Sequence, residues 1–325
     1  MKRSILLLFV SFLLFSCKEE VSNKKGLSES SGNINNVSIF IDEPLWNGEV
    51  GDSLRKKLAA PVDGLPQEEP LFNINQYPTT IFDGFVKKGR NIIVVQKSDK
   101  SGFASKTDLY AAPQNVFFIS GTTSEELIDN IESKAAEIIS VIRNGEIIEN
   151  QRRMKKSLVN DKKIQDMFGL KMNIGYGYNY DMEREKFIWL RKEFQSGYNS
   201  ILIYEAPISR IEKNGTIVEN ITSLRDSIGK ANIHGTLDNT WMITEAAYAP
   251  YLFQVKLDNK FTYLTKGTWE LKNDFMAGPF VNYAIKDTKN NRYLIIEGFT
   301  YLPSKAKRDH VFELEAIINS AKIIK

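Results

Sequence analysis

The sequence predicts an α+β fold with two lobes, in which mostly antiparallel sheets are flanked by helices. Short apolar runs with strand composition recur along the chain, and in its second half they are separated by polar turns. Segments with apolar residues at helical spacing stand between or after these runs. Strands joined by short turns pair antiparallel, and helices gathered at the ends of such runs are typical of the α+β class. We place an N-terminal α/β lobe at residues 37–160 and a C-terminal α+β lobe with an antiparallel sheet at residues 161–325.

The chain begins with the layout of a secretory signal peptide. Two basic residues at positions 2 and 3 precede an apolar run over residues 5–15, which is shorter than the roughly 20 residues of a membrane-spanning helix. Residues 14–17, Leu-Phe-Ser-Cys, resemble a bacterial lipobox, in which the cysteine receives lipid and becomes the mature N-terminus. We therefore predict a signal peptide at residues 1–16 and a lipid attachment site at Cys17, the only cysteine of the chain.

Residues 17–36 have the composition of a flexible tether. They are rich in Ser, Asn, Lys, Glu and Gly and contain almost no apolar side chains. We therefore expect the anchored body to stay close to the outer membrane. Residues 18–20, Lys-Glu-Glu, resemble the short signal that directs some lipoproteins of the Bacteroidota to the cell surface, although the solvated start of a tether explains them equally well. The periplasmic and the cell-surface face of the membrane both stay open.

The charge balance bounds the choice of partners. Without the two basic residues of the signal peptide, 41 Lys and Arg stand against 40 Asp and Glu. Such a nearly neutral body has no global field with which to recruit nucleic acid, so we expect no nucleic-acid partner. No second apolar run of the sequence is long enough to cross a membrane.

The N-terminal lobe is predicted to alternate strands with helices. Apolar runs predict strands at residues 37–41, 71–74, 90–96 and 115–120. Helical spacing predicts a first helix near residues 50–59. Residues 123–126, Thr-Ser-Glu-Glu, fit a capping box that opens a second helix. Asn144 and Gly145 predict the end of that helix, after which a more polar helix is expected at 151–158.

The C-terminal lobe is predicted to consist mainly of strands. Helices are expected near residues 162–168, at 220–231 and at 305–320. Apolar runs separated by polar turns predict strands at residues 171–180, 186–194, 200–206, 251–256, 260–271, 280–286 and 293–301.

Five segments read GDSLRKKLAAPVDGLPQEEPLF, QRRMKKSL, FIWLRKE, FMAGPF and IIEGFTYLPSKAKRDHVFELEA. Together they resemble an uncharacterised family of Bacteroidota lipoproteins, a domain of unknown function. The resemblance covers nearly the whole mature chain. It implies a lipidated envelope protein, and it implies no reaction and no catalytic residues.

The sequence predicts neither a metal site nor another cofactor, because no cluster of residues has metal-ligand spacing. The two histidines, His234 and His310, read as surface or capping residues. Residues 53–56, Ser-Leu-Arg-Lys, match the Ser-x-x-Lys of penicillin-binding enzymes, but the companion Ser-Asp-Asn and Lys-Thr-Gly motifs are missing. We predict no catalytic residue, so an enzyme is disfavoured although not excluded.

Two carboxylates and a set of tyrosines stand out in the predicted strands. Glu205 and Glu297 could form the pair that glycoside chemistry needs, since burial raises the pKa of a carboxyl group and makes it a general acid. We prefer the alternative that each faces solvent or pairs with a neighbouring cation. Tyr176, Tyr178 and Tyr180 alternate, so we expect them on one face of a strand, stacked on a sugar or packed in a core.

Charged residues mark two further candidate binding surfaces. Arg152 and Arg153 concentrate positive charge on a predicted helix, which could meet anionic lipid head groups or remain a solvated face. Gln67, Glu68 and Glu69 form an acidic stretch in a Pro-rich loop. Because the two charges are complementary, we favour a contact between the lobes over a ligand site.

Ser53 and Ser227 each follow an aspartate and precede an apolar residue. This resembles the short pattern that many exported Bacteroidota proteins use for O-glycosylation. A glycan requires a side chain that points to solvent. Ser53 lies about 100° from Leu54, near the edge of the buried helix face, whereas Ser227 shares the inward face of Leu224. We therefore expect Ser53 to be the better acceptor.

These features predict a membrane-anchored cell-envelope lipoprotein whose body is a non-catalytic binding or assembly module. The membrane would be engaged through the N-terminal lipid, and the partner would be an envelope protein or a glycan. The alternative is a surface protein that binds or cleaves glycans. A cleft that holds Glu205 and Glu297 about 5–10 Å apart would favour this alternative.

Overall fold

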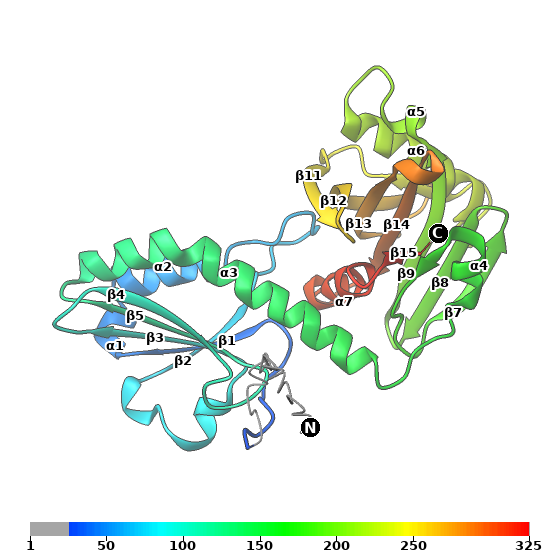
Figure 1. Ribbon diagram of the computed structural model, residues 1–325. Helices are drawn as coiled ribbons and strands as arrows, with labels where there is room; N and C mark the ends of the chain where they lie inside the picture. Colours follow the sequence, from blue (N-terminus) through cyan, green and yellow to red (C-terminus); the bar gives the residue numbers. More distant parts are fainter. Residues whose placement is uncertain (1–25, 325) are drawn as a thin grey trace, which may run out of the picture.

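The computed structural model of the protein describes residues 26–324 and has an α+β fold with two lobes (Figure 1). This agrees with the predicted fold class. The predicted signal peptide, Cys17 and the first part of the predicted tether lie outside the described residues. The long helix α3 (Ser124–Met154) begins on the N-terminal lobe and runs past the C-terminal lobe (Figure 1).

The N-terminal lobe is built on a five-stranded sheet with the order β2-β1-β3-β5-β4. All neighbours pair parallel except β4 and β5, which are antiparallel. The sheet comprises β1 (Asn36–Ile41), β2 (Asn73–Tyr77), β3 (Asn91–Lys97), β4 (Gly102–Thr107) and β5 (Asn115–Gly121). Sequence reasoning missed β4, because its residues GFASKT lack the apolar run that marks the neighbouring strands.

Helices cover one face of this sheet, and loops with short 3-10 turns cover the other. On the first face, α2 (Glu49–Leu58), which follows the short α1 (Glu43–Trp46), packs with α3 over the alternate strand residues Ile39, Ile93 and Phe117. On the second face, the turns η1 (Thr79–Ile81) and η2 (Gly84–Lys88) border the smaller core around Phe40 and Val94. The inner strands β1, β3 and β5 therefore bury residues on both faces, as is typical of parallel strands, whereas the edge strands β2 and β4 stay partly exposed.

Helix α3 is continuous over 31 residues, so the predicted stop at Asn144 and Gly145 is wrong. The N-cap half of the predicted capping box is confirmed, since the Thr123 hydroxyl accepts from the Glu126 N–H at 3.3 Å, but the Glu126 carboxylate accepts from the Thr122 N–H and not from that of Thr123. Gly145 stays in the helix because α3 passes close to the sheet there: a Cβ atom at this position would lie 2.8 Å from Nδ2 of Asn115. Tertiary packing overrides the helix-breaking tendency of a single glycine.

The C-terminal lobe is built on an eight-stranded antiparallel sheet with the order β10-β12-β13-β14-β9-β8-β7, in which β11 also pairs with β12. The strands are β7 (Asn179–Arg184), β8 (Phe187–Phe194), β9 (Gly197–Pro207), β10 (Trp241–Thr244), β11 (Tyr251–Leu257), β12 (Lys260–Lys272), β13 (Ala277–Asp287) and β14 (Arg292–Tyr301). A separate pair joins β6 (Leu170–Lys171) to β15 (Lys322–Ile323).

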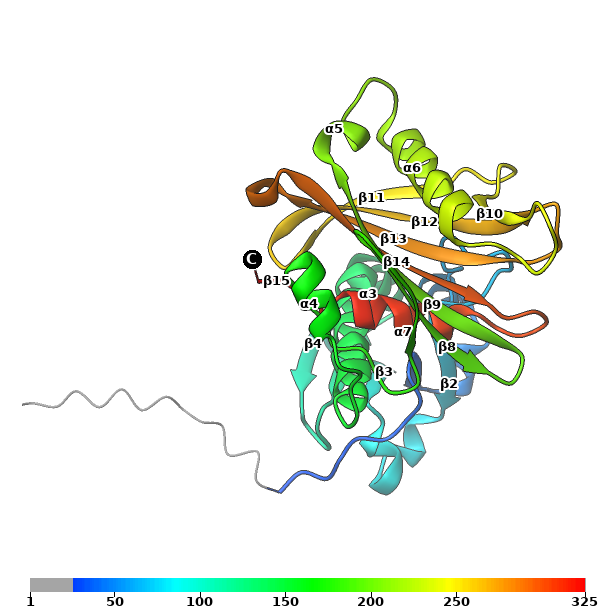
Figure 2. The ribbon, with the colours of Figure 1, turned by 90° about the vertical axis from the view of Figure 1, so that its right-hand side faces the viewer.

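Both faces of this sheet are covered by helices (Figure 2). On one face, α4 (Lys162–Phe168) and α7 (Arg308–Ile318) pack over a core that includes Ile203 and Leu294. On the other face, α5 (Ile208–Ile211) and α6 (Ile217–Asn232) pack over a core that includes Leu202 and Ile295. Consecutive strand residues therefore enter opposite cores. The turn η3 (Thr288–Asn290) joins β13 to β14.

Residues 26–35 pack along the N-terminal lobe, although they fall in the predicted tether. The Ser31 N–H donates to the Lys88 carbonyl at 2.8 Å, and the Asn35 N–H donates to Glu146 at 2.9 Å. These residues therefore find hydrogen-bond partners on the lobe although most of them remain exposed. Only residues 17–25 of the predicted tether lie outside this packed segment.

Candidate functional site

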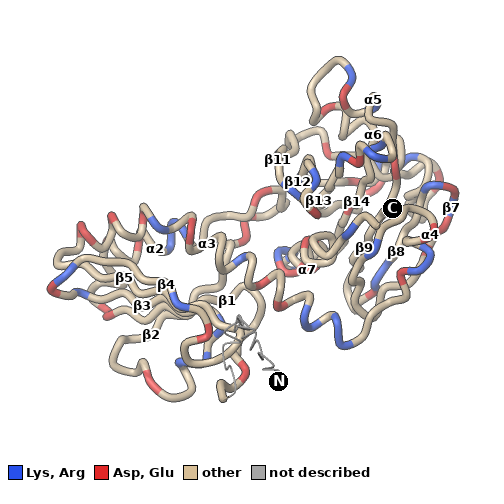
Figure 3. Tube along the Cα trace, viewed as in Figure 1, with Lys and Arg blue, Asp and Glu red and all other residues tan. Residues whose placement is uncertain are grey.

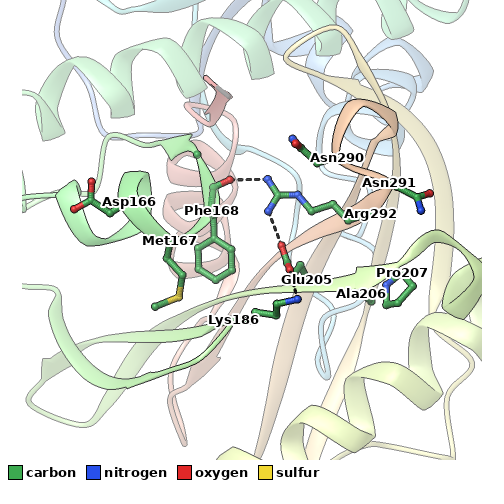
Figure 4. Close-up of a pocket in the computed structure, with 11 residues that line it drawn as sticks. Asp166, Met167, Phe168, Lys186, Glu205, Ala206, Pro207, Asn290, Asn291 and Arg292 are labelled. Carbon is green, nitrogen blue, oxygen red and sulfur yellow. Dashed lines mark hydrogen bonds and ion pairs between the residues drawn. The ribbon is translucent and has the colours of Figure 1, made fainter.

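A pocket of about 650 Å³ opens where the end of α4 meets β9 and the turn that joins β13 to β14 (Figure 4). Its wall combines polar and apolar groups and consists of Asp166, Met167, Phe168, Gly169, Lys186, Glu205, Ala206, Pro207, Asn290, Asn291 and Arg292. Lys186 and Asn291 stand in turns with positive φ values of 57° and 51°. The sequence predicted Glu205 as a candidate and missed the other wall residues, which come from four separate segments.

Glu205 is held between two cations in this pocket. Arg292 donates to its Oε2, and the Lys186 Nζ lies 3.1 Å from its Oε1. Arg292 also donates to the Phe168 carbonyl at 2.6 Å, which fixes the guanidinium (Figure 4). Partial burial acts to raise the pKa of Glu205, but the hydrogen bonds from Arg292 and Lys186 lower it below its usual value. Glu205 is therefore a carboxylate at neutral pH and is unsuited to the role of general acid.

Glu297 lies on the opposite face of the same sheet. The register pairs Leu294 with Glu205, and Glu297 lies three residues further along β14, so its side chain enters the other core. Glu297 is fully buried and accepts from the Arg225 Nε at 2.9 Å and from the Asn282 Nδ2 at 2.8 Å. Burial raises its pKa, against the opposing effect of Arg225. The candidate pair of Glu205 and Glu297 is therefore wrong, because the sheet separates the two carboxylates.

A second pocket, of about 510 Å³, lies between the lobes. It is lined by the loop after α2, by α3, by β11 and β12, and by α7. Glu315 is one of its lining residues and forms ion pairs with both lobes: Lys266 Nζ lies 2.6 Å from Oε1, and Arg143 Nη2 lies 2.7 Å from Oε2. Burial acts to raise the pKa of Glu315, but the charges of Lys266 and Arg143 lower it below its usual value. These three side chains bridge α3, β12 and α7.

Glu69 makes the contact between the lobes that its loop was predicted to make, but with a different partner. Its two carboxylate oxygens accept from the backbone N–H groups of Lys307 and Arg308, at 2.7 and 2.9 Å. These groups open α7, where a helix favours negative charge. Gln67 and Glu68 remain exposed.

Arg152 and Arg153 are engaged by their own helix and by the N-terminal segment. Both donate to the buried Glu149, at 2.6 and 2.7 Å. Arg152 also pairs with Glu29 at 2.7 Å, and Arg153 donates to the Gly32 carbonyl at 3.1 Å. Burial acts to raise the pKa of Glu149, but the hydrogen bonds from the two arginines lower it to about 2. The arginines therefore fasten residues 26–35 to α3.

The tyrosines do not share one face. Strand β7 begins only at Asn179, so Tyr176 and Tyr178 lie in the preceding loop. Tyr178 is buried and its hydroxyl donates to Glu313 at 3.1 Å, whereas Tyr176 is exposed. The prediction of an alternating aromatic strand is wrong, because the loop does not have the two-residue period.

The two serines are exposed in the reverse of the expected order. Ser53 is 8% exposed and its hydroxyl donates to Glu132 at 2.9 Å, between α2 and α3. Ser227 is exposed on α6, with its hydroxyl donating to the Ser223 carbonyl at 2.7 Å. The expectation that Ser53 points to solvent is wrong, because α3 packs over the edge of the buried face of α2 and covers this side chain. Of the two serines, only Ser227 has the exposure that a glycan requires.

Neither histidine lines the two pockets described above. His310 is half-buried against Phe194, with ring centroids 4.6 Å apart, and burial lowers its pKa. His234 lies 3.0 Å from the Lys230 carbonyl through Nε2. Between residues 26 and 324, no group of three or more His, Cys, Asp or Glu side chains is arranged to hold a metal ion.

Strand β11, which the sequence predicted at residues 251–256, lies at an edge of the C-terminal sheet (Figure 1) and lines the pocket between the lobes. The sequence did not show that this edge is exposed. Among the described residues, β11 pairs with β12 alone, so its other edge has no strand partner. Tyr251, Leu252 and Phe253 are 50%, 37% and 37% exposed. The rings of Tyr251 and Phe253 lie 6.4 Å apart and nearly parallel, at 8°. The run Tyr-Leu-Phe after Pro250 predicts a strand, but the same run would also occur in a buried strand. It therefore does not reveal the exposed edge.

Charges of both signs are interspersed over the two lobes (Figure 3). None of the described helices is both long enough and apolar enough to span a membrane.

The fold and its pockets define a two-lobed α+β protein, and its family is a domain of unknown function. Residues 157–320 match DUF4837, and the chain belongs to this family. Residues 30–155 match a second domain of unknown function, DUF8532. The two matches meet between the end of α3 and the start of α4. Among curated proteins, none matches the chain.

The solved structures that resemble the chain are remote. The Ran-binding protein Mog1p of Saccharomyces cerevisiae has 10% sequence identity and a TM-score of 0.34, over 48% of this chain and 91% of Mog1p. A mutant of Mog1 has 8% identity and a TM-score of 0.29, over 48% of this chain and 92% of the mutant. A likeness of this size says nothing about what the present protein binds.

Proposed function

We propose that this protein is a lipid-anchored protein of the bacterial outer membrane whose folded body binds another envelope protein without catalysing a reaction. The support for the anchor is the lipobox resemblance at residues 14–17. Several acyl chains on Cys17 would hold the protein on the membrane far more firmly than one chain could.

The exposed edge of β11 is the observation that carries the binding function. An edge strand presents a row of unpaired N–H and C=O groups, and proteins usually protect such edges with charges, prolines or bulges. The first three residues of β11 are instead Tyr251, Leu252 and Phe253, all exposed, and Lys256 is the only charged residue of the strand. A partner that adds a strand here would pair with the backbone.

The side chains of β11 would contribute affinity on both faces of the added strand. Tyr251 and Phe253 point to the face of α7, since Phe253 pairs with Leu264 of that core. Leu252 points to the other face, together with Phe261 of β12, which pairs with Lys256. Exposed apolar groups on both faces of an unpaired strand are typical of a protein interaction site.

Photo-crosslinking in living cells tests this proposal. A photo-reactive residue at Leu252 should give one dominant adduct, whose second component is identified by mass spectrometry. The same residue at Phe275, which is fully exposed in the turn after β12, should give no such adduct. Leu252→Lys should abolish co-purification of the identified protein and leave the melting temperature unchanged. Equal adducts at both positions would contradict the proposal.

Metabolic labelling tests the anchor. An alkyne analogue of palmitate should label the wild-type protein and leave Cys17→Ala unlabelled, with residues 1–16 absent from the labelled protein. Equal labelling of both proteins would refute the anchor. Replacement of residues 18–20 with alanine tests the membrane face: loss of protease accessibility on intact cells would identify a surface-export signal, and unchanged accessibility would leave these residues as part of the tether.

Glycan binding at the Glu205 pocket is the second candidate function. The observation that favours it is a wall that combines apolar groups with the polar side chains of Asp166, Lys186 and Asn291 and with a carboxylate, Glu205, that stays ionised. Such groups bind hydroxyls. Titration calorimetry with envelope glycans should show binding that Asp166→Ala weakens. Glu183→Ala is the matched control, because Glu183 is likewise a surface carboxylate paired with a lysine.

A further inference from the structure

Exposed apolar side chains gather where the chain enters the N-terminal lobe. Phe85 is 74% exposed, and it is accompanied by Leu27, Ile81 and Leu109, each exposed by at least 40%. We call these four residues the tether-side face. They come from three segments that are distant in the sequence, namely residues 26–32, the turns η1 and η2, and the loop between β4 and β5.

Hydrogen bonds hold these three segments together. Residues 26–32 run between the other two, since the Ser31 N–H donates to the Lys88 carbonyl at 2.8 Å and the Ala112 N–H donates to the Ser28 carbonyl at 3.0 Å. The buried Gln114 joins the loop to η2, because its side-chain nitrogen Nε2 donates to the Lys87 carbonyl at 2.7 Å. Figures 1 and 2 both show residues 26–33 and the η1–η2 segment at the lower end of the molecule.

The length of chain between the proposed anchor and this face is short. Because residues 26–35 are packed on the lobe, only eight residues, 18–25, separate Cys17 from Gly26. The nine Cα–Cα steps from Cys17 to Gly26 span at most about 30 Å when fully extended and about 17 Å on average as a coil. The tether-side face is therefore the part of the folded body that the anchor holds nearest to the bilayer. At such a short distance even weak contacts become populated, since the effective concentration is high.

Basic residues lie beside the apolar ones. Four exposed basic residues lie at the end of α3, namely Arg152, Arg153, Lys155 and Lys156. Arg152 forms an ion pair with Glu29 of residues 26–32. Lys87 and Lys88 stand on η2 itself. Apolar side chains that enter the acyl boundary, flanked by lysine and arginine at the head groups, are typical of surfaces that lie on membranes.

We propose that the tether-side face docks on the bilayer, with Phe85 inserted at the level of the acyl boundary. The proposal rests on the lipid anchor at Cys17 proposed above. Docking gives the anchored protein a fixed orientation, in which the β11 edge faces away from the membrane: both views place β11 at the opposite end of the molecule from residues 26–33 (Figures 1 and 2). The binding edge then stays accessible to a partner.

Fluorescence quenching by lipid tests the docking. The lipidated protein has no free thiol, since its only cysteine carries the anchor. An introduced cysteine can therefore be labelled specifically with an environment-sensitive fluorophore. Phe85→Cys reports on the tether-side face, Ile81→Cys is a second probe on the same face, and Phe275→Cys on the fully exposed turn after β12 is the matched control. Each protein is reconstituted in vesicles of phosphatidylethanolamine and phosphatidylglycerol that contain a doxyl-labelled lipid.

Docking predicts strong quenching and a blue-shifted emission at positions 85 and 81, and neither effect at position 275. Vesicles without phosphatidylglycerol separate the contribution of the basic residues, which should strengthen quenching on the anionic vesicles. Equal quenching at positions 85 and 275 in a protein with intact acyl chains would overturn the docking and leave the anchor standing. A protein whose mass shows no acyl chains would overturn both proposals.

Discussion

At the residue scale, buried carboxylates form ion pairs that hold neighbouring elements together. Glu297 illustrates this, because it is enclosed by the α6 core and its charge is matched by Arg225, whose guanidinium also lies 3.9 Å above the Phe280 ring. A buried ion pair contributes little in itself, but removing one partner leaves an uncompensated charge.

Arg225→Ala should therefore destabilise the protein by about 3–5 kcal/mol. Chemical denaturation followed by tryptophan fluorescence measures the effect. Asp166→Ala is the control, since it breaks an exposed ion pair with Lys162 and should cost at most about 1 kcal/mol. Equal losses of unfolding free energy in both variants would mean that Arg225 and Glu297 do not form a buried ion pair.

Glu149 should make part of the stability depend on pH. Its folded-state pKa, about 2, lies below the usual value of 4.5, so its contribution is fully present above about pH 5 and is lost as the pH falls toward 2. Both arginine partners are partly exposed, and solvent screening reduces the contribution to about 1–2 kcal/mol. In Glu149→Gln the free energy of unfolding should fall below that of the wild type at pH 7, and the gap should close toward pH 2. A gap that is constant with pH would contradict the assignment.

At the scale of elements, close backbone contacts decide where glycines are required. On α6, a Cβ atom at Gly229 would lie 2.3 Å from the Met242 carbonyl oxygen of β10. The glycine therefore allows the helix to lie directly on the edge of the sheet.

Gly229→Ala should destabilise the C-terminal lobe although alanine favours a helix by about 1 kcal/mol over glycine. The reason is that backbone must move to admit the methyl group. Thermal unfolding measures the change, and Ser227→Ala, two residues away on the exposed side of α6, should stay within about 0.5 kcal/mol of the wild type. A stabilised Gly229→Ala protein would show that α6 does not approach β10 so closely.

At the scale of the whole molecule, two sets of charges join the lobes. Glu315 binds Arg143 of α3 and Lys266 of β12, and Glu69 accepts from the first N–H groups of α7. Because α7 belongs to the core of the C-terminal lobe, the first contact holds α3 and the second holds the loop after α2 against that lobe.

Glu69→Ala should loosen the lobes and cost about 1–2 kcal/mol, since it removes both a helix cap and a contact between lobes. Small-angle scattering should show a larger radius of gyration than in the wild type. Glu68→Ala is the matched control, because Glu68 is the exposed neighbour in the same loop. If both variants scatter like the wild type, Glu69 does not hold the lobes.

The sequence by itself determined the α+β class, most of the long strands and the start of α3. Apolar periodicity and a capping threonine are local signals, and burial acts on them in the same way in almost any fold. The sequence also singled out Glu205, a carboxylate within an apolar strand, and Glu69, in an acidic loop expected to contact the other lobe.

Only the tertiary structure decided what those residues contact. The strand register puts Glu205 and Glu297 on opposite faces, and side-chain direction alternates with every residue, so no sequence pattern could fix their relation before the pairing was known. The partner of Glu69 lies 238 residues away, Gly145 stays helical through a contact with β5, and Ser53 is covered by a helix from another segment. Each outcome depends on packing between distant segments, whose contacts a local pattern does not encode.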